Sequence, residues 1–95
     1  MIVKFVGGIR YFVGIKEIEV NFDTLENILE QAGEKIGKKI KLIIDKENMK
    51  TFLVIDDNGK EMKTSVVVHN NGKNILKQEN IEDGELQIIM PVGGG

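Results

Sequence analysis

A chain of 95 residues is the size of a single domain. Its 41% hydrophobic and 29% charged residues are typical of a globular protein, and its net charge of −2 argues against the basic face that nucleic-acid binding usually needs. The absence of cysteine excludes disulfides and thiolate nucleophiles, and a single histidine, His69, excludes a histidine metal cluster. We therefore expect no bound metal, and a self-contained catalytic site is hard to assemble.

Two strands are expected at the beginning of the chain. Residues 2–6 are dominated by β-branched and aromatic side chains, which favour strands. Residues 16–22 alternate between apolar and polar side chains, as a half-buried strand does. Between them, Gly7-Gly8 is a point at which the first strand can bend or bulge. Together the two segments predict an N-terminal hairpin.

A helix is expected at about residues 24–36. Asp23 can cap it, and Glu26 three residues later can complete a capping box. Gly37 is a plausible end, whereas Gly33 lies inside the helix and weakens it. The apolar side chains recur at helical spacing and form one stripe. This stripe consists of Leu25, Ile28, Leu29, Ala32 and Ile36.

The second half of the chain is mostly β. Residues 41–44 form a short apolar run whose type the pattern leaves open. Later segments have strand composition and are separated by dipeptides that favour tight turns. The expected strands cover residues 51–55, 64–69 and 85–90, and the turn dipeptides are Asn58-Gly59, Asn71-Gly72 and Asp83-Gly84.

This order of elements predicts an α+β fold, in which one main helix packs on one face of a mixed sheet. A further hairpin is expected around residues 51–63. The final strand is apolar enough to lie at the centre of the sheet. Leu86, Ile88 and Met90 share one of its faces, and the residues between them lie on the other. A central last strand aims residues 91–95 straight out of the folded domain, where we expect a flexible, glycine-rich tail.

The usual catalytic motifs are missing from the sequence. The glycines near the beginning of the chain do not form a phosphate-binding loop. Pairs of acidic residues occur in alternating or turn positions, where carboxylates are usually solvated. These pairs are Glu17/Glu19, Asp56/Asp57 and Glu82/Asp83. We interpret them, like His69, as structural or exposed rather than catalytic.

The sequence Pro-Val-Gly-Gly-Gly that follows the last strand is the feature best suited to chemistry. Pro91 stiffens the exit from the strand, and Val92 offers a small apolar contact. Gly93, Gly94 and Gly95 have no side chains, so they can pass through a narrow channel. A partner enzyme can thread such a tail and adenylate its terminal carboxylate, which then reacts with sulfur to give a thiocarboxylate or with an amine to give an amide.

On these residues the chain resembles the MoaD/ThiS-type ubiquitin-like sulfur carriers, which include the molybdopterin synthase small subunit, and the related small archaeal modifier proteins. The Pro-Val-Gly-Gly-Gly of residues 91–95 is similar to the family's C-terminal pattern. Asp83-Gly84-Glu85 and the strand and turn of residues 66–72 are similar to the family's motifs. Residues 41–63 are longer than the corresponding family segment.

The resemblance implies a β-grasp domain over residues 1–90 and specific roles for the tail. Gly95 would carry the adenylate and then the thiocarboxylate, Gly93 and Gly94 would line the threaded tail, and Pro91 and Val92 would contact the partner. The chain would bind no cofactor itself and would not be catalytic alone. Its implied partners are an adenylating enzyme similar to ubiquitin-activating enzymes, which uses ATP, a sulfurtransferase, and the molybdopterin synthase large subunit.

Three functions stay open at this point. The first is a sulfur carrier for molybdopterin, and hence molybdenum cofactor, biosynthesis. The second is a protein modifier that is joined through Gly95 to lysines of target proteins, or a carrier for tRNA thiolation. The third is a β-grasp binding domain without terminal chemistry.

The cellular location is expected to be the cytoplasm. No apolar run approaches the roughly 18 residues that a membrane-spanning helix needs. The first residues, MIVKFVGG, lack the basic region and the long apolar region of a signal peptide. Membrane contact is therefore not expected.

Overall fold

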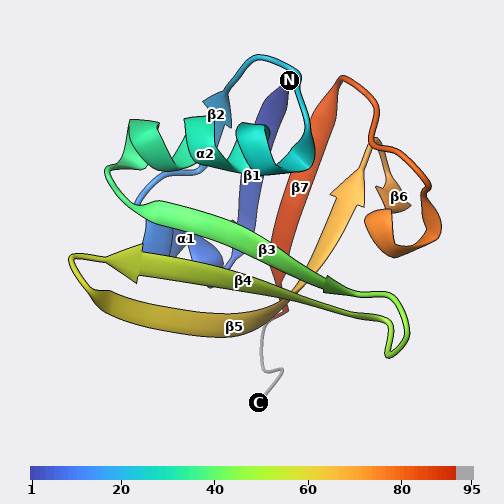
Figure 1. Cartoon of the computed structure of the whole chain (residues 1–95). Coiled ribbons are helices and arrows are strands. Elements are labelled where there is room, and N and C mark those ends of the chain that lie inside the picture. Colours follow the sequence, from blue (N-terminus) through green and yellow to red (C-terminus); the bar gives the residue numbers. More distant parts are fainter. Residues whose placement is uncertain (92–95) are drawn as a thin grey trace.

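The computed structural model describes residues 1–91, which form one mixed sheet and two α-helices (Figure 1). A single 3-10 turn, η1, follows the sixth strand. The elements in chain order are β1 (Ile2–Gly7), α1 (Ile9–Val13), β2 (Glu17–Glu19), α2 (Leu25–Ile36), β3 (Lys39–Asp45), β4 (Lys50–Asp57), β5 (Lys60–Asn70), β6 (Lys73–Asn74), η1 (Ile75–Lys77) and β7 (Glu85–Met90). The expected α+β class is confirmed.

The last strand lies at the centre of the sheet, as its apolar character predicts. The strand order is β2-β1-β7-β5-β4-β3, with β6 paired to β5 at the side. The chain pairs β7 in parallel with β1, where Val3 lies opposite Leu86, and antiparallel with β5, where Val68 lies opposite Ile88. A strand with partners on both sides is fixed along its length, so its end has a defined position at the surface.

A long strand, β5, belongs to both halves of the sheet. Its residues 60–66 pair with β4, and its residues 67–70 pair with β7. Figure 1 shows the result: β3, β4 and the first part of β5 run across the direction of β1 and β7. Strands that bend in this way form the corners of orthogonally packed sheets. The hairpin expected around residues 51–63 is confirmed as the β4–β5 pair, and residues 41–44 belong to β3.

The core lies between α2 and the inner face of this curved sheet. Val3 and Phe5 of β1, and Leu86 and Ile88 of β7, are completely or almost completely buried. They pack in one cluster with residues of the predicted helix stripe, including Ile28. Burying one such side chain contributes about 1.5–3 kcal/mol. The periodic apolar positions of β7 and α2 therefore account for the way the two layers face each other.

A short helix, α1, replaces the simple bend that the sequence predicts after β1. It buries Ile9 and Val13, and it ends at Gly14, which adopts a left-handed conformation and donates its N–H to the carbonyl of Arg10. Two buried residues in five are too few to produce a helical period in the sequence. The expected pairing of the first two strands is nevertheless confirmed, because β1 and β2 are antiparallel, although β2 covers only Glu17–Glu19.

The cap of α2 is Thr24 rather than Asp23, so the predicted capping box is wrong. The Thr24 hydroxyl accepts a hydrogen bond from the Asn27 N–H at 3.2 Å. Asp23 instead accepts hydrogen bonds from the Thr24 N–H and the Asn27 side chain. An N-cap side chain bonds the N–H two or three residues further on, so a cap at Thr24 makes Asn27, not Glu26, the third helical residue.

Gly33 is required by packing, although helix propensity disfavours it. A Cβ at this position would lie 2.5 Å from the backbone carbonyl oxygen of Lys38, because the chain turns back sharply after Gly37, whose φ is +72°. We expect Gly33→Ala to lower the free energy of unfolding by about 1–3 kcal/mol, whereas propensity alone would raise it by about 1 kcal/mol. Thermal denaturation followed by circular dichroism measures the difference. The exposed neighbour Glu34 provides a control, since Glu34→Ala should change stability by less than about 0.5 kcal/mol. A stabilised Gly33→Ala variant would contradict the packing argument.

Candidate functional site at the end of the last strand

The predicted site residues fall on either side of the limit of the described chain. Pro91 is exposed and follows β7 directly. Val92, Gly93, Gly94 and Gly95 lie outside the described residues. The geometry of the site is therefore the geometry of the surface from which these residues continue.

The end of β7 is held on both sides. On one side Gly7 lies opposite Met90, and on the other Val67 lies opposite Ile89. Gly7 has a φ of +80°, and a side chain there would collide with the carbonyl oxygen of Met90. Gly7 therefore allows the backbone to turn towards α1 against the last residue of β7, which is the physical reason for a glycine at this position.

The outer face of the sheet carries a row of three apolar side chains next to the exit of the chain. Val6, Ile89 and Val67 lie side by side on β1, β7 and β5, and each is exposed or half-buried. The next row is polar and contains His69, which is paired with Gln87. We call the three apolar residues the exit row. The alternation along β7 places Ile89 on the outer face, but the cross-strand register is what brings its two partners beside it.

Polar and charged side chains border the exit row on the same face. Lys4 forms an ion pair with Glu85 at 3.1 Å, and both side chains are partly exposed. A partly exposed pair of this kind contributes at most about 1 kcal/mol. The outer face therefore changes from apolar at the exit of the chain to charged at the opposite end of β1 and β7.

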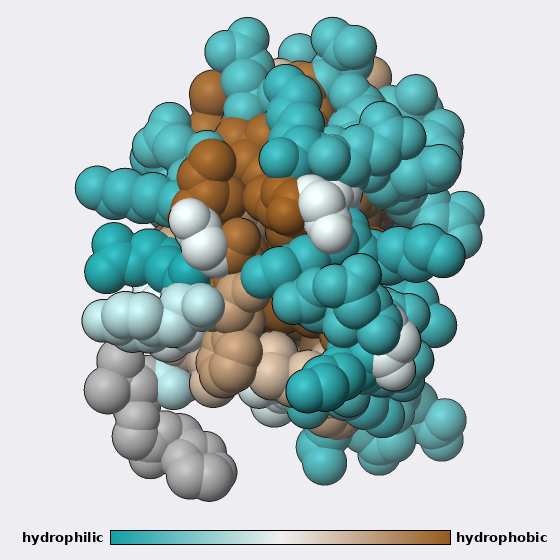
Figure 2. All heavy atoms as spheres, turned by 90° about the vertical axis from the view of Figure 1, so that its left-hand side faces the viewer, coloured by the Kyte–Doolittle hydropathy of each residue, from teal (hydrophilic) through white to brown (hydrophobic). Residues whose placement is uncertain are grey.

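A second apolar surface lies on α1, beside the same exit. Tyr11 is 86% exposed, and Phe12 and Ile15 are each 41% exposed. A Cβ on Gly8 would lie 3.5 Å from the Met90 sulfur, so α1 begins in contact with the end of β7. Figure 2 views the molecule from the left-hand side of Figure 1 and shows a band of apolar surface between hydrophilic side chains.

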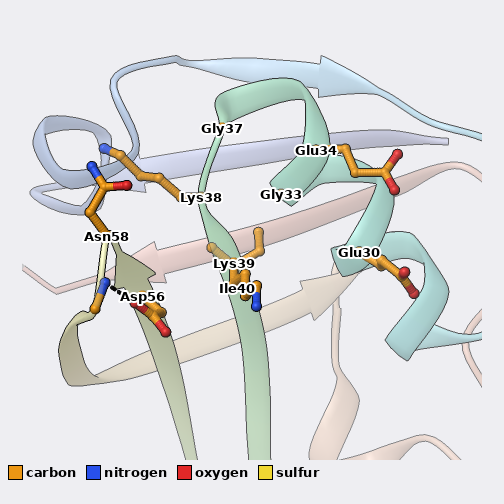
Figure 3. Close-up of a pocket in the computed structure, with 10 residues that line it drawn as sticks. Glu30, Gly33, Glu34, Gly37, Lys38, Lys39, Ile40, Asp56 and Asn58 are labelled. Carbon is orange, nitrogen blue, oxygen red and sulfur yellow. Dashed lines mark hydrogen bonds between the residues drawn. The ribbon is translucent and has the colours of Figure 1, made fainter.

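A hollow with a volume of 660 Å³ lies elsewhere, between the end of α2, the start of β3 and the β4–β5 turn. Figure 3 shows that Glu30 and Glu34 point away from Asp56 and Asn58, which lie across the hollow. The Asp56 carboxylate accepts a hydrogen bond from the Gly59 N–H at 2.9 Å and so supports the turn. Glu30 and Glu34 therefore do not face Asp56 across the hollow.

Other titratable groups are also dispersed. Glu17 and Glu19 lie on β2, Asp56 and Asp57 end β4, and Glu82 and Asp83 precede β7. Within residues 1–91, no group of three or more histidine, aspartate or glutamate side chains is arranged to hold a metal ion. Hydrogen bonds from Asn48 hold the pKa of Asp45 below its usual value, but Asp45 is the last residue of β3, and these bonds stabilise the turn that follows it.

None of the helices in the described part of the chain is both long and apolar enough to span a membrane. Comparison with protein-family models, with curated proteins and with solved structures gave no match.

Proposed function

We propose that this chain is a ubiquitin-like sulfur carrier with a β-grasp domain, whose C-terminal Gly95 is converted to a thiocarboxylate that donates sulfur in molybdopterin biosynthesis. One observation carries the proposal: the Pro-Val-Gly-Gly-Gly sequence continues from a central strand that ends beside the exit row. A tail that reacts inside a partner needs a rigid point of attachment to the domain and an apolar surface next to it that the partner can bind. The end of β7 supplies the first, and Val6, Ile89 and Val67 supply the second.

The chemistry needs little from the chain beyond its terminal carboxylate. In the first step the carboxylate attacks the α-phosphate of ATP, which is bound by the partner, and pyrophosphate leaves. In the second step the outer sulfur of a persulfide on the sulfurtransferase attacks the carbonyl carbon and displaces AMP, which gives an acyl disulfide. A thiol then attacks the sulfurtransferase's sulfur in this disulfide, so that a new disulfide forms and a thiocarboxylate is released on Gly95. Gly93 and Gly94 give access to a narrow channel, and Pro91 and Val92 contact its mouth. A chain without cysteine has no persulfide of its own, so the thiocarboxylate is the form in which it would carry sulfur.

The β-grasp assignment is supported by the sheet topology. The N-terminal pair β1–β2 is antiparallel, α2 crosses to the other half of the sheet, and the last strand returns to lie parallel to β1 at the centre. The chain leaves such a domain from a strand that is paired on both sides, so the end of β7 has a fixed place at the surface.

A second candidate function is protein modification or tRNA thiolation, and the β3–β4 hairpin favours it. This hairpin extends the sheet beyond β5 and forms its edge, with Ile43 and Ile44 of β3 both partly exposed. A molybdopterin synthase large subunit that binds a shorter carrier would have to accommodate this additional hairpin. If Gly95 instead forms amide bonds, digests of cell extract will contain lysine side chains linked to the C-terminal peptide of this chain.

The primary test is intact-mass measurement. The chain ending at Gly95 is incubated with ATP, an adenylating enzyme, a sulfurtransferase from the same cell, a sulfur donor for that sulfurtransferase and a thiol reductant. We expect the mass increase of one oxygen replaced by sulfur, located at Gly95 by fragmentation, and no increase without ATP. An unchanged mass with an enzyme that adenylates another carrier in the same tube would refute the proposal.

The exit row gives a separate prediction. Val67→Asp places a carboxylate between partner and carrier, so we expect the KM for adenylation to rise about 10- to 100-fold with a small change in kcat. Ser65→Asp is the matched control, because Ser65 lies two residues earlier on β5, is exposed, and has its side chain on the same face. Steady-state pyrophosphate release measures both constants. Equal KM values for the two variants would remove the exit row from the interface.

A further inference from the structure

Helix α1 exposes apolar side chains that the fold itself does not use. Ile9 and Val13 point into the core and attach the helix to the domain. Tyr11 and Phe12 occupy the outer side, and Tyr11 has the largest exposed fraction among the large hydrophobic residues that the structure describes. A five-residue helix with two inward anchors does not need two outward aromatic side chains for stability. Aromatic side chains are, however, enriched where protein interfaces are strongest.

The length of the tail determines what must lie against α1. Four residues, 92–95, follow the described chain, and a fully extended segment of four residues reaches at most about 14 Å. An enzyme that closes its active site around the Gly95 carboxylate must therefore bring its own surface close to Pro91. That surface also meets whatever surrounds Pro91 on the carrier.

The surroundings of this exit include α1 as well as the exit row. Gly8 packs on the Met90 side chain, and the Tyr11 N–H donates to the Gly8 carbonyl at 3.1 Å. Tyr11 is thus one helical turn from Gly8, or about 5 Å along the axis. The rise from Gly8 to Tyr11 is shorter than the reach of the tail. We therefore expect an enzyme that holds the tail to cover this part of α1.

The charge around α1 adds a property that the partner must match. Arg10 and Lys16 are exposed at the two ends of the aromatic pair. Lys38 extends from the α2–β3 turn and donates a hydrogen bond to the carbonyl of Phe12. Positive charge therefore lies beside the aromatic pair at Lys38, and a complementary surface is an apolar recess with carboxylates at its border.

We propose that α1, through Tyr11 and Phe12, is a second docking surface for the adenylating enzyme, which contacts the carrier on both sides of the tail's root. The inference rests on the proposed function and identifies where and with what chemistry the partner binds. The partner's matching surface is an apolar recess with an acidic border. Because α1 carries no reacting group, its contribution is to binding and not to the chemical steps.

The test compares three variants with the wild-type chain: one double serine variant, one single serine variant as a control, and Tyr11→Phe. Y11S/F12S should raise the KM for adenylation about 10- to 100-fold and leave kcat within about twofold, because the lost contacts stabilise substrate and transition state equally. Phe22→Ser is the matched control: Phe22 is also partly exposed, but it precedes α2, and its KM should equal that of the wild type. Tyr11→Phe keeps the aromatic ring and should keep most of the wild-type affinity. Raising the salt concentration should increase the wild-type KM, since the charged border is screened.

The outcomes separate this inference from the function on which it rests. Circular dichroism first establishes that Y11S/F12S unfolds at the same temperature as the wild type within a few degrees. A wild-type chain that is adenylated while Y11S/F12S has an unchanged KM overturns the α1 surface and leaves the proposed function standing. A fall in kcat with unchanged KM also overturns it. A wild-type chain that the enzyme does not adenylate overturns the proposed function, and the α1 surface with it.

Discussion

Deleting Gly95 is expected to reduce thiocarboxylate formation by at least about 100-fold. The deletion leaves a carboxylate on Gly94 and withdraws it by about 3.5 Å from the position that the root of the tail defines. Misplacing a reacting group by only about 1 Å can reduce a rate by about 100-fold. Adding one alanine after Gly95 should have a similar effect, because it moves the carboxylate forward and introduces a side chain into the channel. Intact-mass measurement after a fixed time gives the rates.

Stability provides the control for the tail variants. The core of the described chain is built by elements that end with β7 at Met90, so both variants should unfold at the wild-type temperature in a thermal denaturation experiment. An extended chain that still forms a thiocarboxylate on its new terminal residue would show that the position of the carboxylate is not controlled. That result would contradict the tail mechanism.

Shortening Ile88 to alanine is expected to lower the free energy of unfolding by about 2–5 kcal/mol, because Ile88 is completely buried at the centre of the sheet. Total stabilities of domains are about 5–15 kcal/mol, so this single change removes a large share. Urea denaturation measures the difference. The effect should appear as a lower midpoint with an unchanged slope.

The neighbouring residue of the same strand should behave in the opposite way. Ile89 faces outward in the exit row, so Ile89→Ala should cost less than about 1 kcal/mol in stability but raise the KM for adenylation. The two variants shorten one isoleucine on each face of β7. Ile88→Ala reports on folding, and Ile89→Ala reports on docking. If Ile89→Ala destabilises the chain as much as Ile88→Ala, the outer face of the sheet is covered, and the exit row is not available to a partner.

Patterns in the sequence predict the layers of the fold well where they extend over many residues. The stripe in α2 and the apolar side chains of β7 identify the helix and the central strand, because both repeat at a clear period. Patterns predict α1 poorly, since Ile9 and Val13 are its only inward anchors. The cap predicted for α2, Asp23, lies one residue before the observed cap, Thr24. Both are good capping residues, and only the backbone conformation distinguishes them.

The candidate site is predicted in part for a similar reason. The glycine-rich sequence carries the proposal for the reacting end of the chain, which lies outside the described residues, and alternation along β7 places Ile89 on the outer face. Val6 and Val67 become its neighbours only through strand register, which depends on contacts between segments more than 60 and 20 residues apart in the chain. Exposed aromatic residues on α1 give no periodic signal, and the contact of this helix with β7 emerges only from the structure.

The central position of β7 also determines how the domain responds to mechanical force. A pull applied beyond Pro91 acts along β7, parallel to its length, and loads the hydrogen bonds to β1 and β5 together instead of opening them one at a time. Forced unfolding depends on the unfolding rate rather than on equilibrium stability. A pull from the C-terminal side of the domain therefore has to break many hydrogen bonds of the sheet at once.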